Sequence, residues 1–339
     1  MPSRPPSEQG CDTWPEAGDS RAGGVAAGPV LDTLLAMTRS TRAVAALVAA
    51  LLCLSACSDG DTTGSAPEAT APGVGTGDGS IGFDRPACDE ESLGTDGDIE
   101  FTTARYVVDG ALGEVCFGGD DPALTSAWED LSTITPPEQL DQLALFGGFA
   151  SAEDGQDETL AFVNVLTDDG EFFQMSVNLG AFDADPDEAT LTMAHEFSHV
   201  FTQAPGQLDR TVVDPEDCGT YFNGEGCYLP DSLMARWVAD FWDPSELASI
   251  DPMDEPGVED GAGRCADDPG FFGSYAATTP EEDFAEAFSA YVFRLAPENQ
   301  EQQVRLDWFA AESTMAEYRE RATAAGIGPL ENNFDLCGV

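Results

Sequence analysis

The sequence contains no lysine, and its 13 basic residues are all arginines, against 64 acidic residues. The formal net charge is therefore -51 at pH 7. A field of this sign repels phosphate backbones and anionic lipid headgroups, which argues against nucleic-acid binding and against membrane attachment through a basic patch. A solvated acidic surface accounts for the charge better than a specific cationic partner does.

Histidines and closely paired cysteines are scarce as well. The chain has two histidines, His195 and His199, so a metal site with three protein ligands must take the third from an acidic residue or a cysteine. The nine cysteines show no CxxC spacing, which argues against a zinc site made of cysteines. Apolar residues are plentiful, at 42% hydrophobic and 9% aromatic, enough for one large globular domain or two small ones.

Residues 37–56 have the pattern of an export signal. Two arginines precede an apolar stretch, residues 43–53, that is too short to span a bilayer, and residues 54–57 read LSAC. These four residues resemble the bacterial lipobox, which implies that Cys57 is lipidated and becomes the first residue of the mature protein. The alternative is an ordinary cleaved signal with a free cysteine nearby. We expect an extracytoplasmic protein, lipid-anchored to the outer face of the bacterial cytoplasmic membrane.

This signal divides the chain. Residues 1–36 have no export pattern of their own, so we expect translation to begin at Met37. Residues 57–82 are dominated by small and polar residues with almost no large apolar side chain, which predicts a flexible linker. Residues 83–339 form the predicted folded domain.

The domain holds six cysteines: Cys88, Cys116, Cys218, Cys227, Cys265 and Cys337. In an oxidising compartment they predict three disulfides, with fifteen possible connectivities. Cys218 with Cys227 is the pair that we expect first.

Strand-like runs come first in the domain and helical periodicity follows. We expect strands at 99–108, 143–150, 160–166 and 172–179, and helices at 122–131, 187–203, 231–241, 280–295 and 297–325. Residues 167–170, TDDG, are a good hairpin turn between the last two strands. The order of elements predicts an α+β domain with an antiparallel or mixed sheet, the antiparallel arrangement being the natural one, rather than a parallel doubly wound sheet.

The two histidines lie four positions apart on one predicted helix. They are then about 40° apart around the helix axis, so both imidazoles can bind one ion. Zinc suits imidazole, and a catalytic zinc site takes three protein ligands and keeps a position for water. Glu196 lies about 100° from His195, where its carboxylate can act as general base without ligating the metal. The alternative is an amphipathic helix with two surface histidines.

Candidates for the third ligand stand in residues 275–291. Pro280 can open a helix on which Glu282 and Glu286 share a face, away from a buried apolar stripe. We expect Glu282 to bind zinc and Glu286 to hydrogen-bond a liganding histidine. Glu281 is out of phase with Glu286, so we expect it to interact with backbone amides or solvent.

The two segments together resemble the gluzincin group of HExxH zincin metallopeptidases, and most closely the catalytic domain of anthrax lethal factor and related bacterial zinc-binding metallopeptidase lipoproteins. In that family a tyrosine stands seven residues before the ligand glutamate of an E-F-F-A-E-A-F segment. Tyr275 and Glu282 keep this spacing, with Asp283 in place of the first phenylalanine. The resemblance implies one zinc ion held by His195, His199 and Glu282, with Glu196 as base and Tyr275 stabilising the oxyanion.

The resemblance covers the two motif segments alone, about 25 residues. The roughly 80 residues between them depart from the family, so substrate preference does not transfer. Two of the roles also have simpler alternatives. Thr279 and Glu282 fit a capping box in which Glu282 binds no metal, and Tyr275 could be a buried structural tyrosine.

We therefore expect residues 83–339 to form a zincin-like metallopeptidase domain, with the sheet over the active-site helix and a helical C-terminal part. The expected activity is zinc-dependent hydrolysis of a peptide or protein substrate, which pairs in extended form with an edge of the sheet. The alternative from another class is a lipid-anchored binding or scaffold protein that keeps the fold and a structural zinc but cleaves nothing.

Overall fold

The computed structural model describes residues 86–89, 92–93, 99–151, 159–252, 258–332, 334 and 337. All of them belong to the second of the two units into which the chain divides, Gly77–Val339. The predicted export signal, Cys57 and the predicted linker lie outside the described residues. Within the described ranges, no helix is both long enough and apolar enough to cross a membrane.

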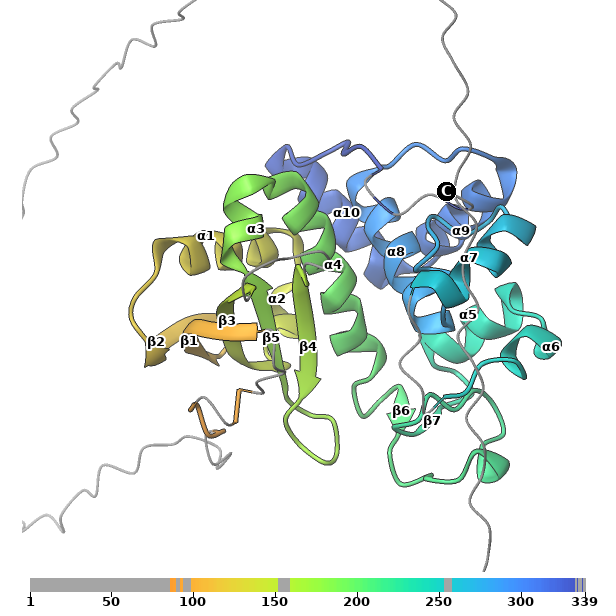
Figure 1. The fold of residues 1–339 in the computed structure, drawn as a ribbon, viewed down its shortest axis with the longest axis horizontal. Helices are drawn as coiled ribbons and strands as arrows, with labels where there is room; N and C mark the ends of the chain where they lie inside the picture. The colour runs from red at the N-terminus through yellow and green to blue at the C-terminus, as the bar shows by residue number, and fades with distance from the viewer. Residues whose placement is uncertain are drawn as a thin grey trace, which may run out of the picture. The chain divides into compact units, whose positions relative to one another are not determined.

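A five-stranded sheet forms the first part of the domain (Figure 1). Its strands are β1 (Ile99–Val108), β2 (Ala111–Gly118), β3 (Leu143–Ser151), β4 (Ala161–Val165) and β5 (Phe173–Asn178), in the spatial order β2-β1-β3-β5-β4. β1 pairs antiparallel with β2 and with β3, and β4 and β5 form the antiparallel pair predicted from their turn. A second, two-stranded sheet joins β6 (Leu208–Asp209) to β7 (Cys227–Tyr228).

One pair departs from the expected antiparallel arrangement, because β3 and β5 run parallel. The chain passes from β3 to the edge strand β4 and returns through the hairpin into the position between them. β5 is antiparallel to β4, so it must run in the same direction as β3. The large sheet is therefore mixed and the domain is α+β.

Strand β2 is a feature that the sequence analysis missed, although a signal for it was present. Asp109 and Gly110 join β1 to β2, and both have positive φ angles, 50° and 65°. Two successive residues with positive φ match a type I′ hairpin turn, for which Asp-Gly is a preferred dipeptide. The dipeptide thus predicts a hairpin at this point.

The described residues contain ten α-helices: α1 (Pro122–Ile134), α2 (Pro137–Leu140), α3 (Leu179–Ala184), α4 (Pro186–Thr202), α5 (Leu233–Phe241), α6 (Pro244–Leu247), α7 (Val258–Asp267), α8 (Pro280–Phe293), α9 (Gln300–Ala311) and α10 (Ser313–Ala325). A short 3-10 helix covers Pro215–Asp217. In Figure 1, α4 lies between the sheet and the C-terminal helices, with α8 beside it.

The helix predicted at 297–325 is two helices instead of one. Glu312 separates α9 from α10 with extended backbone angles, φ -91° and ψ 110°. Its carboxylate accepts hydrogen bonds from the Arg236 guanidinium of α5 at 2.6 and 3.0 Å. This contact joins the break to α5, and a periodicity pattern could not reveal it.

The main core forms where α4 packs against the sheet on one side and α8 on the other. Phe201 of α4 meets the ring of Phe288 at 5.3 Å between centroids, and Phe146 and Met175 of the sheet are fully buried in the same core. The Ser289 hydroxyl of α8 donates to the Leu191 carbonyl of α4 at 3.1 Å. These contacts fix the two helices that carry the candidate metal ligands.

The structure pairs all six cysteines of the domain as Cys88–Cys116, Cys218–Cys227 and Cys265–Cys337. The Cys218–Cys227 pair is the one that the sequence predicts. The Cys265–Cys337 pair joins α7 to the C-terminal end of the chain, across a sequence separation of 72.

Candidate metal centre

Helix α4, which carries both histidines, begins with strong local signals. Asp185 caps it by accepting the N–H of Glu188 at 3.2 Å, and Pro186 occupies the first helical position, where a missing N–H has no consequence. Asp187 and Glu188 place negative charge in the first turn, where the helix dipole favours it. His199 lies in the last turn, where the dipole favours positive charge.

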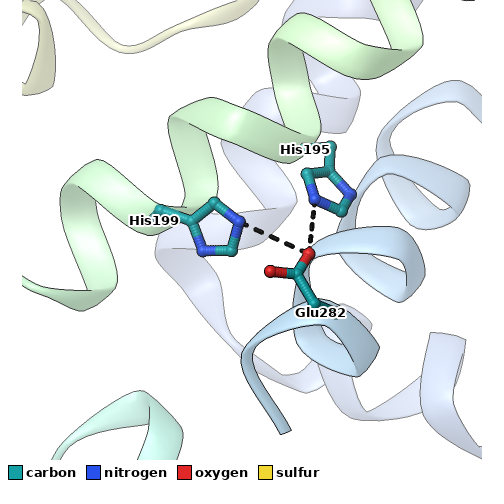
Figure 2. Close-up of side chains that lie close together, drawn as sticks. All are labelled: His195, His199 and Glu282. Atoms are coloured by element: carbon teal, nitrogen blue, oxygen red, sulfur yellow. Dashed lines mark hydrogen bonds and ion pairs between the residues drawn. The ribbon is translucent and has the colours of Figure 1, made fainter. Parts of the chain in front are cut away.

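Three donor atoms converge between α4 and α8 (Figure 2). Oε2 of Glu282 lies 2.8 Å from Nε2 of His195 and 3.6 Å from Nε2 of His199. The donor atoms of the three residues all lie within 4.8 Å of one another, and no other such group of His, Cys, Asp and Glu occurs in the described part of the chain. The predicted ligand residues are therefore brought together.

The orientation of Glu282 bears on the capping-box alternative. Thr279 is the N-cap of α8, and its hydroxyl accepts the backbone N–H of Glu282 at 3.3 Å. The Glu282 carboxylate is turned toward His195. The cap therefore uses the backbone of Glu282, while its side chain remains directed at the histidines.

His195, His199 and Glu282 together favour a positive charge between their side chains. Burial opposes protonation of His199, but the charge and hydrogen bond of Glu282 outweigh burial and raise the pKa of His199 to about 9. Burial raises the pKa of Glu282, yet His199 and His195 outweigh it and hold that pKa well below the usual value. A carboxylate and two imidazoles so arranged are stabilised by a cation between them, either a proton or a metal ion.

The donor set fits zinc. Zinc takes imidazole nitrogen and carboxylate oxygen at about 2.0–2.2 Å, which places neighbouring donors about 3.3 Å apart in a tetrahedral site. The two distances at Glu282 Oε2, 2.8 and 3.6 Å, bracket this separation. Both histidines direct Nε2 toward Glu282. Three protein ligands would leave the fourth position of a tetrahedral zinc ion for water or substrate.

Glu196 and Tyr275 flank this group. Glu196 is half-buried beside His195 on α4, and burial raises the pKa of its carboxyl against the opposing charges of the two histidines. The ring of Tyr275 stacks on His195 with centroids 6.0 Å apart, and the residue is 36% exposed, so it is not a fully buried structural tyrosine. The negative charge of Glu282 and then burial raise the pKa of Tyr275, so its hydroxyl stays protonated.

Glu286 is buried one turn after Glu282 on α8. Its Oε1 accepts the backbone N–H of Ala276 at 3.2 Å. This bond ties α8 to the segment that carries Tyr275. The predicted hydrogen bond from Glu286 to a liganding histidine stays a prediction.

Glu281 differs from its expected placement among backbone amides or solvent. It is 9% exposed, and its Oε2 accepts the hydroxyl hydrogen of Tyr221 at 2.8 Å. Burial raises the pKa of Glu281 to about 7, against the lowering effect of Tyr221. The sequence analysis did not single out Tyr221, because the only signal for it is its place within the Cys218–Cys227 loop.

Comparison of the chain with protein-family models, with curated proteins and with solved structures gives no match. The function assigned to this site therefore depends on the residues themselves, on their geometry and on their chemistry.

Proposed function

We propose that this α+β domain is a zinc-dependent metallopeptidase of the zincin type, with one zinc ion held by His195, His199 and Glu282. The observation that carries the proposal is the convergence of their three donor atoms within 4.8 Å, with Glu196 adjacent on α4. Bound zinc would supply a Lewis acid and lower the pKa of a coordinated water toward about 7.

The neighbouring residues would transfer the protons and stabilise the negative charge that develops during peptide hydrolysis. Glu196 has a raised pKa and lies beside the ligands, so it would take a proton from water and return it to the leaving amine. The Tyr275 hydroxyl, kept protonated next to Glu282, would donate a hydrogen bond to the oxyanion. Strand β4 is an edge of the sheet and packs near α4, so it offers its backbone to an extended peptide.

The proposal includes the compartment. Residues 37–57 would export the chain and attach it by lipid at Cys57 to the outer face of the bacterial cytoplasmic membrane. The three cysteine pairs at bonding distance are consistent with an oxidising compartment. The acidic surface would keep nucleic acids and anionic lipid headgroups away from the domain.

The test combines metal analysis with the Glu196→Gln variant. We expect one zinc per chain in both proteins, because Glu196 is not a ligand. Turnover of a broad peptide library should fall at least about a hundredfold in the variant, the typical contribution of a general base. Asp187→Asn, which removes an exposed acid from the first turn of the same helix, is the matched control and should retain activity.

The outcomes separate the alternatives. Absence of zinc from the wild type at neutral pH would refute the metal site. Retained turnover in Glu196→Gln would identify another base. Zinc bound by both proteins with no turnover by either would favour a binding or scaffold protein.

A further inference from the structure

Glu281 and Glu282 are consecutive on α8 but contact different parts of the molecule. Glu282 faces the two histidines, whereas Glu281 accepts the hydroxyl hydrogen of Tyr221 at 2.8 Å. Residues 221 and 281 are 60 positions apart in sequence, so this bond closes a long tertiary connection. A carboxylate that is 9% exposed needs such a hydrogen bond, because burial without one is costly.

Tyr221 is held firmly where it makes this bond. Its ring stacks on Tyr228, with centroids 5.8 Å apart and planes 2° from parallel. Its carbonyl accepts the backbone N–H of Tyr228 at 2.9 Å, and Tyr228 is buried. The Cys218–Cys227 disulfide closes the loop that contains Tyr221. The tyrosine is therefore fixed in both backbone and ring.

The Cys218–Cys227 loop is also connected to α4, the helix that carries both histidines. Strand β7 at its end pairs with β6, which follows α4 in the chain, and the N–H of Leu208 donates to the carbonyl of Ala204 at 3.1 Å. Arg210 binds both Glu225 of the loop and the carbonyl of Gln203, the C-cap residue of α4. Contacts thus run without a gap from the last turn of α4, through the loop, to the first turn of α8.

We propose that the Tyr221–Glu281 hydrogen bond sets the separation between His199 and Glu282, which makes Tyr221 and Glu281 positioning residues of the metal centre. This inference rests on the proposed zinc site. His199 lies in the last turn of α4 and Glu282 in the first turn of α8, so the bond braces the two helices at the ends that carry the ligands.

How much zinc affinity depends on the Tyr221–Glu281 bond is set by the other contacts that join α4 to α8 near the ligands. The rings of Phe201 and Phe284 also meet near the ligands, with centroids 6.2 Å apart, and this apolar contact would keep the helices together without the hydrogen bond. Loss of the hydrogen bond should therefore weaken zinc binding without abolishing it. Residues that orient metal ligands typically change affinity about 10–100-fold, and we expect the lower end of this range.

The experiment measures zinc affinity of the full purified chain by competition with a chelator, and the visible spectrum of bound Co2+. Tyr221→Phe keeps the ring stack but removes the hydroxyl, so zinc affinity should fall about tenfold and the Co2+ bands should shift. Glu281→Gln keeps an acceptor oxygen for the Tyr221 hydroxyl, so its zinc affinity should stay within about threefold of wild type.

A matched control is Tyr318→Phe, which keeps the ring but removes another buried tyrosine hydroxyl, one that donates to Gln139 of α2 and not to α4 or α8. It should lose stability without changing zinc affinity or the Co2+ spectrum. Wild-type affinity and an unchanged spectrum in Tyr221→Phe would overturn the inference, as would an equal loss in Tyr221→Phe and Glu281→Gln. A wild type that binds no zinc would instead refute the proposed function, and the inference with it.

Discussion

Glu282 and Asp283 are neighbours on α8, and both are acids that the fold takes out of bulk solvent, yet their surroundings differ. Asp283 is fully buried and accepts hydrogen bonds from the indole N–H groups of Trp237 at 2.9 Å and Trp242 at 3.0 Å, and from Arg305 at 3.1 Å. Glu282 faces two imidazoles, and its side chain is 16% exposed. Asp283 has a permanent counter-ion in Arg305, whereas Glu282 belongs to the group for which we propose a bound metal ion.

Arg305, the counter-ion of Asp283, is itself held in place by several contacts. The guanidinium lies over the rings of Phe241 and Phe271, 5.1 and 4.8 Å from their centroids, and also bonds Asp268 at 3.3 Å. Burial raises the pKa of Asp283, and the charge of Arg305 is the main opposing effect. Asp283 therefore faces an arginine that keeps its charge at all working pH values, whereas Glu282 faces histidines whose charge depends on their protonation.

The largest expected effect tests the structural side of this comparison. Asp283→Ala would leave Arg305 buried without its main counter-ion and two indole N–H groups without an acceptor, so the free energy of unfolding should fall by about 3–5 kcal/mol. Denaturant unfolding of the metal-free protein measures this. The double variant Asp283→Ala with Arg305→Leu should recover part of the loss. A change below about 1 kcal/mol would show that the two acids do not differ in this way.

The next effect tests the ligand side. Glu282→Ala should lose most of the zinc affinity, because it removes one of three proposed ligands. Zinc at a hundred times its dissociation constant stabilises a binding protein by about 2.7 kcal/mol. This stabilisation, read from unfolding with and without zinc, should be seen in wild type and be absent in the variant. Unchanged affinity would remove Glu282 from the ligand set.

The smallest effect uses a third ion pair, Arg236 with Glu312, which is partly exposed. The hydrogen bond from Arg236 holds the pKa of Glu312 below its usual value. A depressed pKa stabilises the fold above the unfolded pKa, about 4.3, and the gain is lost as pH falls through the lower folded value. Glu312→Gln should therefore cost at most about 1 kcal/mol near pH 7 and nothing at lower pH. A loss as large as that of Asp283→Ala would mean that burial does not separate these acids.

The sequence predicts the local part of the fold well. The helix from Pro186 to Thr202, the hairpin of β4 and β5 and the Cys218–Cys227 pair follow from caps, turn residues and short spacing. The parallel pairing of β3 with β5 could not be predicted in this way, because it depends on where the returning strand inserts. Pairing across the sheet is set by tertiary packing that no local pattern encodes.

In the candidate site, too, local sequence patterns predict some contacts and miss those that depend on tertiary packing. The convergence of His195, His199 and Glu282 is predicted from helical spacing on two helices and from a family resemblance. The partners of Glu281 and Asp283 were not predicted, because Tyr221 and the indole and guanidinium donors come from loops and helices far away in sequence. A run of three acids, Glu281 to Asp283, gives no sign that each contacts a different element.

The Cys265–Cys337 pair has a consequence for what happens when the backbone is cut. It closes a covalent ring across a sequence separation of 72, and this ring contains α8 with Glu282. A single backbone cut inside the ring would leave both pieces joined by the disulfide, so a nicked molecule would keep Glu282 covalently connected to α4. Only a second cut, or reduction of the disulfide, would release a fragment. The ring therefore makes the domain tolerant of one accidental cleavage within its C-terminal part.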